Sequence, residues 1–214
     1  LTKDEMTVRK LCVAGRTLEV TGEGYTPHGR FLLNGQMVEP DAQLRGLLQS
    51  AALASDAQIV FSASDNRWKI KGDPTEAAIV VAAEKAGLKK VDLDASYRRI
   101  AEIPFTSESK RMTTLHESRG ERVVYSKGAP EVILNSCTRQ LSGGALIALS
   151  PADRTAIMEE ARRMAGGALR VLAVASKPGA EVAEAERDML FMGLMGMIDP
   201  PRPEARAAIR TCES

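Results

Sequence analysis

Residues 110–134, KRMTTLHESRGERVVYSKGAPEVIL, contain two β-like runs on either side of a short turn. The runs 110–117 and 121–127 flank the tripeptide SRG, whose glycine suits a tight reversal of the chain. Directly after the second run, Pro130 suits the first turn of a helix, where its missing N–H costs nothing. The stretch therefore predicts an antiparallel hairpin that leads straight into a helix.

Lys127 and Gly128 lie at the expected junction between this strand and this helix. Residues at such junctions often border concave surfaces, and a glycine removes the Cβ that would block the approach of a ligand. The alternative for Lys127 is an ordinary solvated lysine in a turn. The residues from Lys127 to Pro130, taken alone, favour the solvated turn lysine.

The segment GDPTEAAIVVAAEKAG, residues 72–87, carries the start and stop signals of a helix. Asp73 suits the N-cap and Pro74 the first helical position, while Gly87 suits the residue that ends the helix. Glu76 falls at the third helical position, where an acid can complete a capping box. We therefore expect a helix that begins after Asp73.

Comparable signals mark the remaining elements. A helix is expected between Ser150 and the glycines at 166 and 167, and another over 41–54. We expect strands at 98–105, 169–176 and 190–197, a Gly-Gly hairpin at 139–149, and a pair of turns at 21–36. Because strands and helices are mixed and a hairpin is present, we expect an α+β fold, an antiparallel β-sheet covered by helices.

The composition excludes several classes of function. The 29 Lys and Arg against 28 Asp and Glu leave a net charge of +1, without the basic excess typical of proteins that bind nucleic acid. Three widely spaced cysteines, Cys12, Cys137 and Cys212, form no CxxC pair and indicate reduced thiols. The two histidines, His28 and His116, lie outside any HExxH motif, so no metal site is expected.

The length of 214 residues and the 44% hydrophobic content suffice for one large domain or two small ones. The longest uncharged apolar run, at 189–198, is half of the roughly 20 residues that span a bilayer, so we expect this chain not to insert in a membrane. It begins with Leu1 and shows no signal peptide, and we expect it to be a piece of a longer protein.

Five fragments in a fixed order carry the strongest functional signal, although no GxxxxGK[ST] phosphate loop is present. They are KGDPTE at 71–76, FTSESKRMTTL at 105–115, KGAPE at 127–131, LRVLAVA at 169–175 and GLMGMIDPPRPE at 193–204. This ordered set resembles the nucleotide-binding domain of cation-transporting P-type ATPases, most closely the type II pumps that include calcium ATPases. The opening LTKDEMTV is similar to the tail of that family's phosphorylation-site motif.

The resemblance implies three segments. Residues 1–5 are expected to be a stub of the phosphorylation domain, 6–199 the nucleotide-binding domain, and 200–214 a hinge with a second stub. The run that resembles the family's DPPR hinge consists of Asp199, Pro200, Pro201 and Arg202. We expect these residues to be structural, because two prolines stiffen the connection.

The family pattern also implies an ATP site. Phe105 matches the phenylalanine on which adenine stacks, with a core phenylalanine on an edge strand as the alternative. Glu76 matches the glutamate that accepts from the adenine amino group, a role that is compatible with a capping box. Lys110, Lys127 and Arg170 match the pocket cations and are expected to form a basic cluster for the phosphates.

Two further pocket positions and one departure complete the implied site. Met112 matches a pocket methionine, although a methionine on a strand is more often part of the core. Gly128 belongs to the KGAPE motif of the pocket floor. Ser107 stands where many type II pumps carry an arginine, which removes one contact to phosphate or ribose.

The resemblance thus implies an ATP-binding domain, of the calcium type by motif similarity, that positions ATP for phosphoryl transfer to an aspartate outside this chain. No catalytic nucleophile is recognised in it, and the ligands of the Mg²⁺ used by the parent enzyme are expected elsewhere. We therefore expect the chain to bind ATP without turning it over.

The expected partners are ATP and the phosphorylation and actuator domains of a parent chain. This domain would be a monomer and a cytoplasmic part of a multi-pass membrane protein. One alternative is a non-catalytic regulatory module that binds a nucleotide or a protein. Another is a small phosphatase or kinase, which would need a DxD-type pair or a phosphate loop that we do not find in the sequence.

Overall fold

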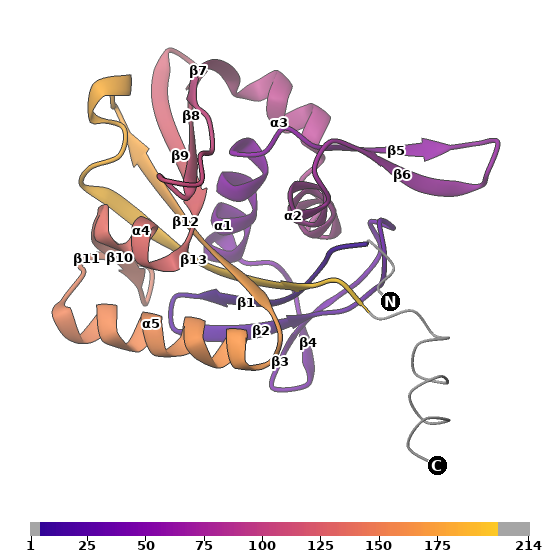
Figure 1. The fold of residues 1–214 in the computed structure, drawn as a ribbon, viewed down its shortest axis with the longest axis horizontal. Coiled ribbons are helices and arrows are strands. Elements are labelled where there is room, and N and C mark those ends of the chain that lie inside the picture. Colours follow the sequence, from indigo (N-terminus) through magenta and orange to yellow (C-terminus); the bar gives the residue numbers. More distant parts are fainter. Residues whose placement is uncertain (1–4, 201–214) are drawn as a thin grey trace.

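The computed structural model describes residues 5–200 of the chain. Pro201 and Arg202 of the expected hinge lie outside the described residues, as do nearly all of the two expected stubs. The described part forms a large β-sheet with helices on both faces and a projecting two-stranded ribbon (Figure 1).

The strands of the large sheet are β1 (Thr7–Val13), β2 (Arg16–Val20), β3 (Phe31–Leu33), β4 (Gln36–Val38), β7 (Arg98–Ile103), β8 (Arg111–Ser118), β9 (Glu121–Gly128), β10 (Cys137–Ser142), β11 (Ala145–Ala148), β12 (Arg170–Pro178) and β13 (Met189–Ile198). The ribbon consists of β5 (Gln58–Ser62) and β6 (Arg67–Lys71). The helices are α1 (Ala42–Leu53), α2 (Pro74–Lys85), α3 (Lys90–Ser96), α4 (Pro130–Asn135), α5 (Pro151–Gly166) and the 3-10 turn η1 (Val182–Glu184).

The large sheet is antiparallel at all but one of its described strand pairs. Its strands follow the order β4-β3-β2-β1-β13-β12-β9-β8-β7, and the β10–β11 hairpin joins the beginning of β13. The exception is the parallel pairing of β10 with β13, which the sequence did not predict. The expected α+β fold with an antiparallel sheet covered by helices is confirmed.

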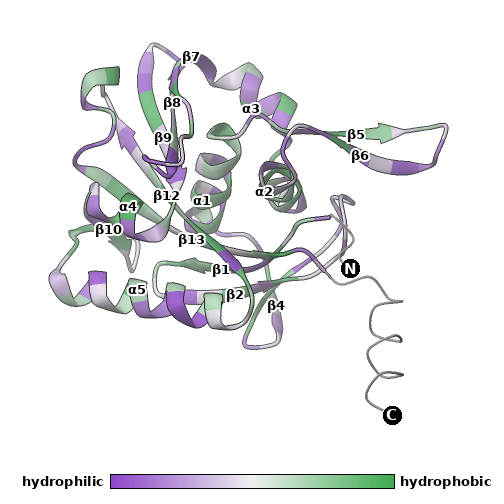
Figure 2. Cartoon of the chain, viewed as in Figure 1, coloured by the Kyte–Doolittle hydropathy of each residue, from purple (hydrophilic) through white to green (hydrophobic). Residues whose placement is uncertain are grey.

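The central strands divide the interior into two hydrophobic clusters. Along β12, Val174 packs into the cluster that contains α1 and α2, whereas Ala173 and Ala175 pack into the cluster that contains α4 and α5. This alternation follows from the two-residue period of a strand, which sends successive side chains to opposite faces. Figure 2 shows hydrophobic residues along β12 and β13, with more hydrophilic positions on α5.

The expected helices form where their caps predict them. Asp73 caps α2 by accepting from the backbone N–H groups of Thr75 and Glu76. At the other end, Gly87 has a φ of +76° and the Leu88 N–H donates to the Ala83 carbonyl, which completes a left-handed C-terminal cap. In α5, the Ser150 cap forms a full capping box, and α1 begins after its Asp41 cap.

The β8–β9 hairpin and its exit into α4 are confirmed. β9 ends at Gly128, and Pro130 occupies the first turn of α4. The register places Met112 opposite Lys127 and Arg111 opposite Gly128. The hairpin therefore brings two of the implied ATP-site residues side by side.

Other parts of the fold were not predicted. The strands β1 and β2, the ribbon β5–β6 and the short helix α3 had no prediction, and part of the turn segment 21–36 forms β3. The strand expected at 98–105 ends at Ile103, so Phe105 lies beyond it. The apolar run at 189–198 is the central strand β13, and none of the helices within residues 5–200 is long and apolar enough to cross a membrane.

Candidate functional site

A cavity of about 460 Å³ opens where α2 meets the ends of β8, β9 and β12. Its volume lies within the range of typical small-molecule sites. The lining residues come from four elements and two connecting segments, and they are Asp73, Thr75, Glu76, Phe105, Met112, Lys127, Gly128, Arg170 and Leu172. Six of the seven residues that the sequence implied for an ATP site are therefore brought together, and Lys110 is the exception.

A buried ion pair forms the inner end of the cavity. The Lys127 side chain is 8% exposed, and its Nζ donates to Glu76 Oε1 at 2.7 Å. The same ammonium also donates to the Ala54 carbonyl and contacts the Met112 sulfur. Burial lowers the pKa of Lys127, and the adjacent Glu76 carboxylate opposes that shift without cancelling it. The alternative of a solvated turn lysine is wrong.

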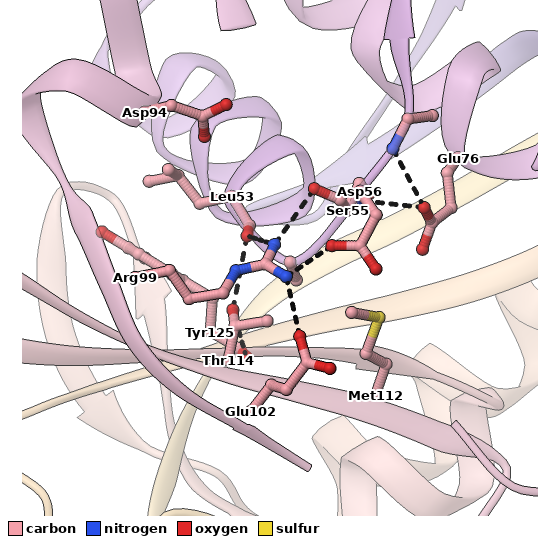
Figure 3. A network of polar contacts seen from close by, with 12 residues as sticks. Leu53, Ser55, Asp56, Glu76, Asp94, Arg99, Glu102, Met112, Thr114 and Tyr125 are labelled. Atoms are coloured by element: carbon pink, nitrogen blue, oxygen red, sulfur yellow. Dashed lines mark hydrogen bonds and ion pairs between the residues drawn. The ribbon is translucent and has the colours of Figure 1, made fainter. Parts of the chain in front are cut away.

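The second carboxylate oxygen of Glu76, Oε2, is held by two backbone N–H groups. Oε2 accepts from the backbone N–H groups of Asp56 at 2.7 Å and Ala57 at 3.2 Å. The side chain therefore does not turn back to the N–H of Asp73, and α2 is capped by Asp73 alone. The capping-box alternative for Glu76 does not describe this carboxylate, because its Oε1 accepts from Lys127. Figure 3 shows the Glu76 carboxylate facing Asp56 in the segment after α1.

Phe105 provides an exposed aromatic face at the cavity. It is 60% exposed and lies in the loop after β7, so the alternative of a core phenylalanine is wrong. Met112, which is 6% exposed, and Leu172 supply apolar atoms to the same wall. An aromatic face together with an apolar wall suits a flat, polarizable ring.

Arg170 supplies a positive charge at the cavity. Its Nη1 donates to Thr75 Oγ1 at 2.9 Å, and the residue is otherwise exposed. Lys110 is exposed as well, has a left-handed φ of 50° and does not line the cavity, and its carbonyl accepts from the Ala129 N–H. Lys127 and Arg170 both line the cavity and Lys110 does not, so the three expected cations do not form one cluster. Because Lys127 is buried and paired with Glu76, Arg170 is the lining cation whose charge is exposed.

The need for glycine at position 128 has a different cause from the one expected. A Cβ there would lie 2.4 Å from the Lys110 carbonyl oxygen and 2.7 Å from the Arg111 Cα. The space in front of Gly128 is thus filled by the neighbouring strand, and close packing of β8 on β9 requires the glycine. We expected Gly128 to leave room for a ligand, and this expectation is wrong, because the glycine leaves room for the neighbouring strand.

At the expected hinge, Asp199 and Pro200 are the described residues. The Asp199 carboxylate accepts from the backbone N–H of Glu5 at 3.4 Å. This long hydrogen bond joins the two ends of the described part of the chain. Asp199 and Pro200 do not line the cavity. Ser107, the departure from the family pattern, is exposed and does not line the cavity either.

Sequence reasoning missed several residues around the site. Asp73, Thr75 and Leu172 line the cavity and lie within the KGDPTE and LRVLAVA motifs, although no part in binding was expected for them. Asp56 and Arg99 belong to the surrounding polar network (Figure 3), in which Arg99 donates to the Leu53 and Ser55 carbonyls and to Asp56. These contacts span more than 40 residues, so no local signal could have revealed them.

Magnesium is implied by the family, and the described residues do not fit its binding. Within residues 5–200, no group of three or more His, Cys, Asp or Glu side chains could hold a metal ion. Glu76 is committed to Lys127 and two N–H groups, and Asp73 to the cap of α2. No step is therefore assigned to a metal bound by these residues.

Comparison with known proteins identifies the class. Residues 43–204 match the family described as P-type ATPase, cytoplasmic domain N, so the chain belongs to that family of cation-transporting ATPase domains. This match covers the cavity and its polar network. It confirms the resemblance that the five ordered motifs indicated.

Individual relatives agree with this family. The chain is 36% identical to the calcium-transporting ATPase of Bacillus subtilis and 37% identical to the cation-transporting ATPase pma1 of Synechocystis, in each case over 99% of this chain and 24% of the relative. It is 34% identical to the calcium-transporting ATPase type 2C member 1 of Bos taurus, over 99% of this chain and 21% of that protein. The chain thus spans about a quarter of the length of the curated relatives it matches.

Proposed function

We propose that this domain binds ATP in the 460 Å³ cavity and presents its phosphates for transfer to an aspartate outside the described residues. The observation that carries the proposal is the convergence of an exposed aromatic ring, a fixed carboxylate and a cation on one cavity. Phe105, Glu76 and Arg170 lie on three separate parts of the chain, and the fold gathers them. Purine nucleotides require this combination of stacking, polar recognition and charge.

The geometry favours one orientation of the nucleotide. The base stacks on Phe105 and against Met112, with its exocyclic amine directed to the Glu76 carboxylate. Each carboxylate oxygen has two lone pairs, and Oε1 accepts one hydrogen bond in the described structure, from Lys127. One acceptor position therefore remains for the amine, whereas the carbonyl oxygen of guanine would face a carboxylate.

The phosphates extend toward Arg170 in this orientation. Arg170 is exposed, as is Lys110 nearby, so their attraction is screened by solvent. We expect the affinity to be modest, weaker than about 1 µM, because one stack, one polar contact and screened cations must offset the entropy of association. Such a domain serves the reaction by positioning ATP and not by forming bonds.

The function of the parent protein follows from this role. We propose a cation-transporting P-type ATPase, with calcium as the ion suggested by the names of two relatives. ATP would phosphorylate an aspartate of the phosphorylation domain with Mg²⁺ held there. This domain would lie on the cytoplasmic side of a multi-pass membrane protein and contact the phosphorylation and actuator domains.

The experiment is isothermal titration calorimetry with ATP and with adenosine. Arg170→Gln should weaken ATP by about two- to fivefold, since an exposed charge contributes little, and should leave adenosine unchanged. The matched control is Arg119→Gln in the β8–β9 turn, at the opposite end of the hairpin from Gly128. Equal losses for ATP and adenosine would contradict the orientation, and the absence of ATP binding to the wild type would contradict the function.

A further inference from the structure

The C-terminus of α1 obtains its positive partners from distant strands. The last turn of α1 contains no basic residue, although its final carbonyl groups carry partial negative charge. Arg99 of β7 donates from Nη2 to the Leu53 and Ser55 carbonyls, both at 3.1 Å, and Lys127 of β9 donates to the Ala54 carbonyl. Three consecutive carbonyl groups are thus held by two cations.

Arg99 also reaches the side chains beside this turn. Its Nη1 donates to the Asp56 carboxylate and, at 2.9 Å, to Glu102. The guanidinium therefore holds four acceptors with two of its nitrogens, and the side chain is only 26% exposed. A lysine cannot reproduce this planar arrangement, because its ammonium is a single point charge with three donors.

The turn that Arg99 fixes is the one that holds Glu76. The acceptors of Arg99 include the Ser55 carbonyl and the Asp56 side chain, and the next two N–H groups, of Asp56 and Ala57, donate to Glu76 Oε2. Figure 3 shows this chain of contacts from Arg99 through the segment after α1 to Glu76. Arg99 itself does not line the cavity.

We propose that Arg99 is a positioning residue that sets the base selectivity of the nucleotide cavity without touching the nucleotide. The inference rests on the proposed function, in which the Glu76 carboxylate accepts from the adenine amine. By fixing the turn at Ser55 and Asp56, Arg99 holds two N–H groups in the direction that orients Glu76. When the turn is released, the carboxylate rotates, and the distinction between an amine and a carbonyl on the base is lost.

The test measures the affinities of ATP and GTP by calorimetry, at a temperature well below the melting point of every variant. Arg99→Lys keeps the charge and removes the planar fork, so the preference for ATP over GTP should fall by about five- to tenfold, the effect of one misplaced hydrogen bond. The matched control is the adjacent Arg98→Lys, because Arg98 is 74% exposed and has one long contact with Glu117. This control should retain the wild-type preference.

A second variant and a double variant make the test independent of stability. Asp56→Asn keeps the backbone N–H and the helix contacts of Arg99 but removes a carboxylate partner, and it should lower the preference in the same direction. Combining Arg99→Lys with Glu76→Gln should lower the preference no further than Glu76→Gln alone, because both changes act through one carboxylate.

The outcomes separate the two proposals. If Arg99→Lys lowers only the melting temperature and the preference for ATP persists in both it and Asp56→Asn, Arg99 is structural and the inference is overturned. If Arg99→Lys and Glu76→Gln lower the preference additively, the action through Glu76 is overturned. If the wild type binds no ATP or shows no preference, the failure lies with the proposed function.

Discussion

Phe105→Ala separates binding from stability, because the ring is exposed and lines the cavity. A fully buried phenylalanine costs about 3–5 kcal/mol when truncated to alanine. Phe105 is 60% exposed, so less than half of its surface is removed from water, and its truncation should lower the free energy of unfolding by about 1 kcal/mol or less. The fold should therefore survive the change.

The effect on binding should be much larger than the effect on stability. Stacking of a base on an aromatic side chain is worth about 1–3 kcal/mol, so Phe105→Ala should weaken ATP by about five- to a hundredfold. The loss should be the same for adenosine, because the ring contacts the base and not the phosphates.

Calorimetry and thermal melting on the same preparation provide the assay. The matched control is Phe61→Ala on the β5–β6 ribbon, where the ring is 48% exposed and packs on Trp68 with no contact to the cavity. Phe61→Ala should leave the affinity unchanged. Wild-type affinity in Phe105→Ala, with a melting curve that shows a folded protein, would refute the stacking argument.

Three further changes test other parts of the site. Lys127→Met should destabilise the fold by about 3 kcal/mol, because it leaves the Glu76 carboxylate without its buried partner, and chemical denaturation should show partial recovery when Glu76→Gln is added. Gly128→Ala should cost about 1–3 kcal/mol, since its Cβ would meet the Lys110 carbonyl at 2.4 Å, and a melting temperature equal to the wild type would contradict that. Burial lowers the pKa of His116 below its usual 6.5, so the unfolded chain binds more protons and stability should fall as the pH drops below 6.5. The difference in melting temperature between the wild type and His116→Gln should shrink over that range, and a constant difference would show that His116 is not responsible.

The parts of the fold that could be predicted are those fixed by local chemistry. The cap of Asp73, the proline after it and the terminal Gly87 act within a few residues, so they placed α2 correctly. The ribbon β5–β6 was missed although Phe61 faces Trp68 across it, since each strand has only five residues and the adjacent exposed apolar residues Val60 and Phe61 break the alternation of β5. Helix α3 was missed because its N-cap is Lys89, which makes no side-chain capping bond.

In the candidate site, too, some features could be predicted from local sequence and others depended on contacts between distant residues. Phe105, Met112 and Arg170 stand in motifs whose order along the chain indicated the family, and the fold brings them to one cavity. The partners of Lys127 and the role of Arg99 depend on contacts with the end of α1 that span 73 and 46 residues. Only the folded structure could show that one expected phosphate ligand is already neutralised by Glu76.

The most direct test of the account is an NMR titration of the ¹⁵N-labelled protein with ATP, followed through its backbone amide resonances. We predict that the largest shifts arise at residues around the 460 Å³ cavity, in particular Thr75, Phe105, Met112 and Gly128. They should be reduced in Phe105→Ala at the same concentration of ATP. The account would be contradicted if the shifts clustered instead at the hollow beside Tyr97 and Arg119, or if saturating ATP produced none.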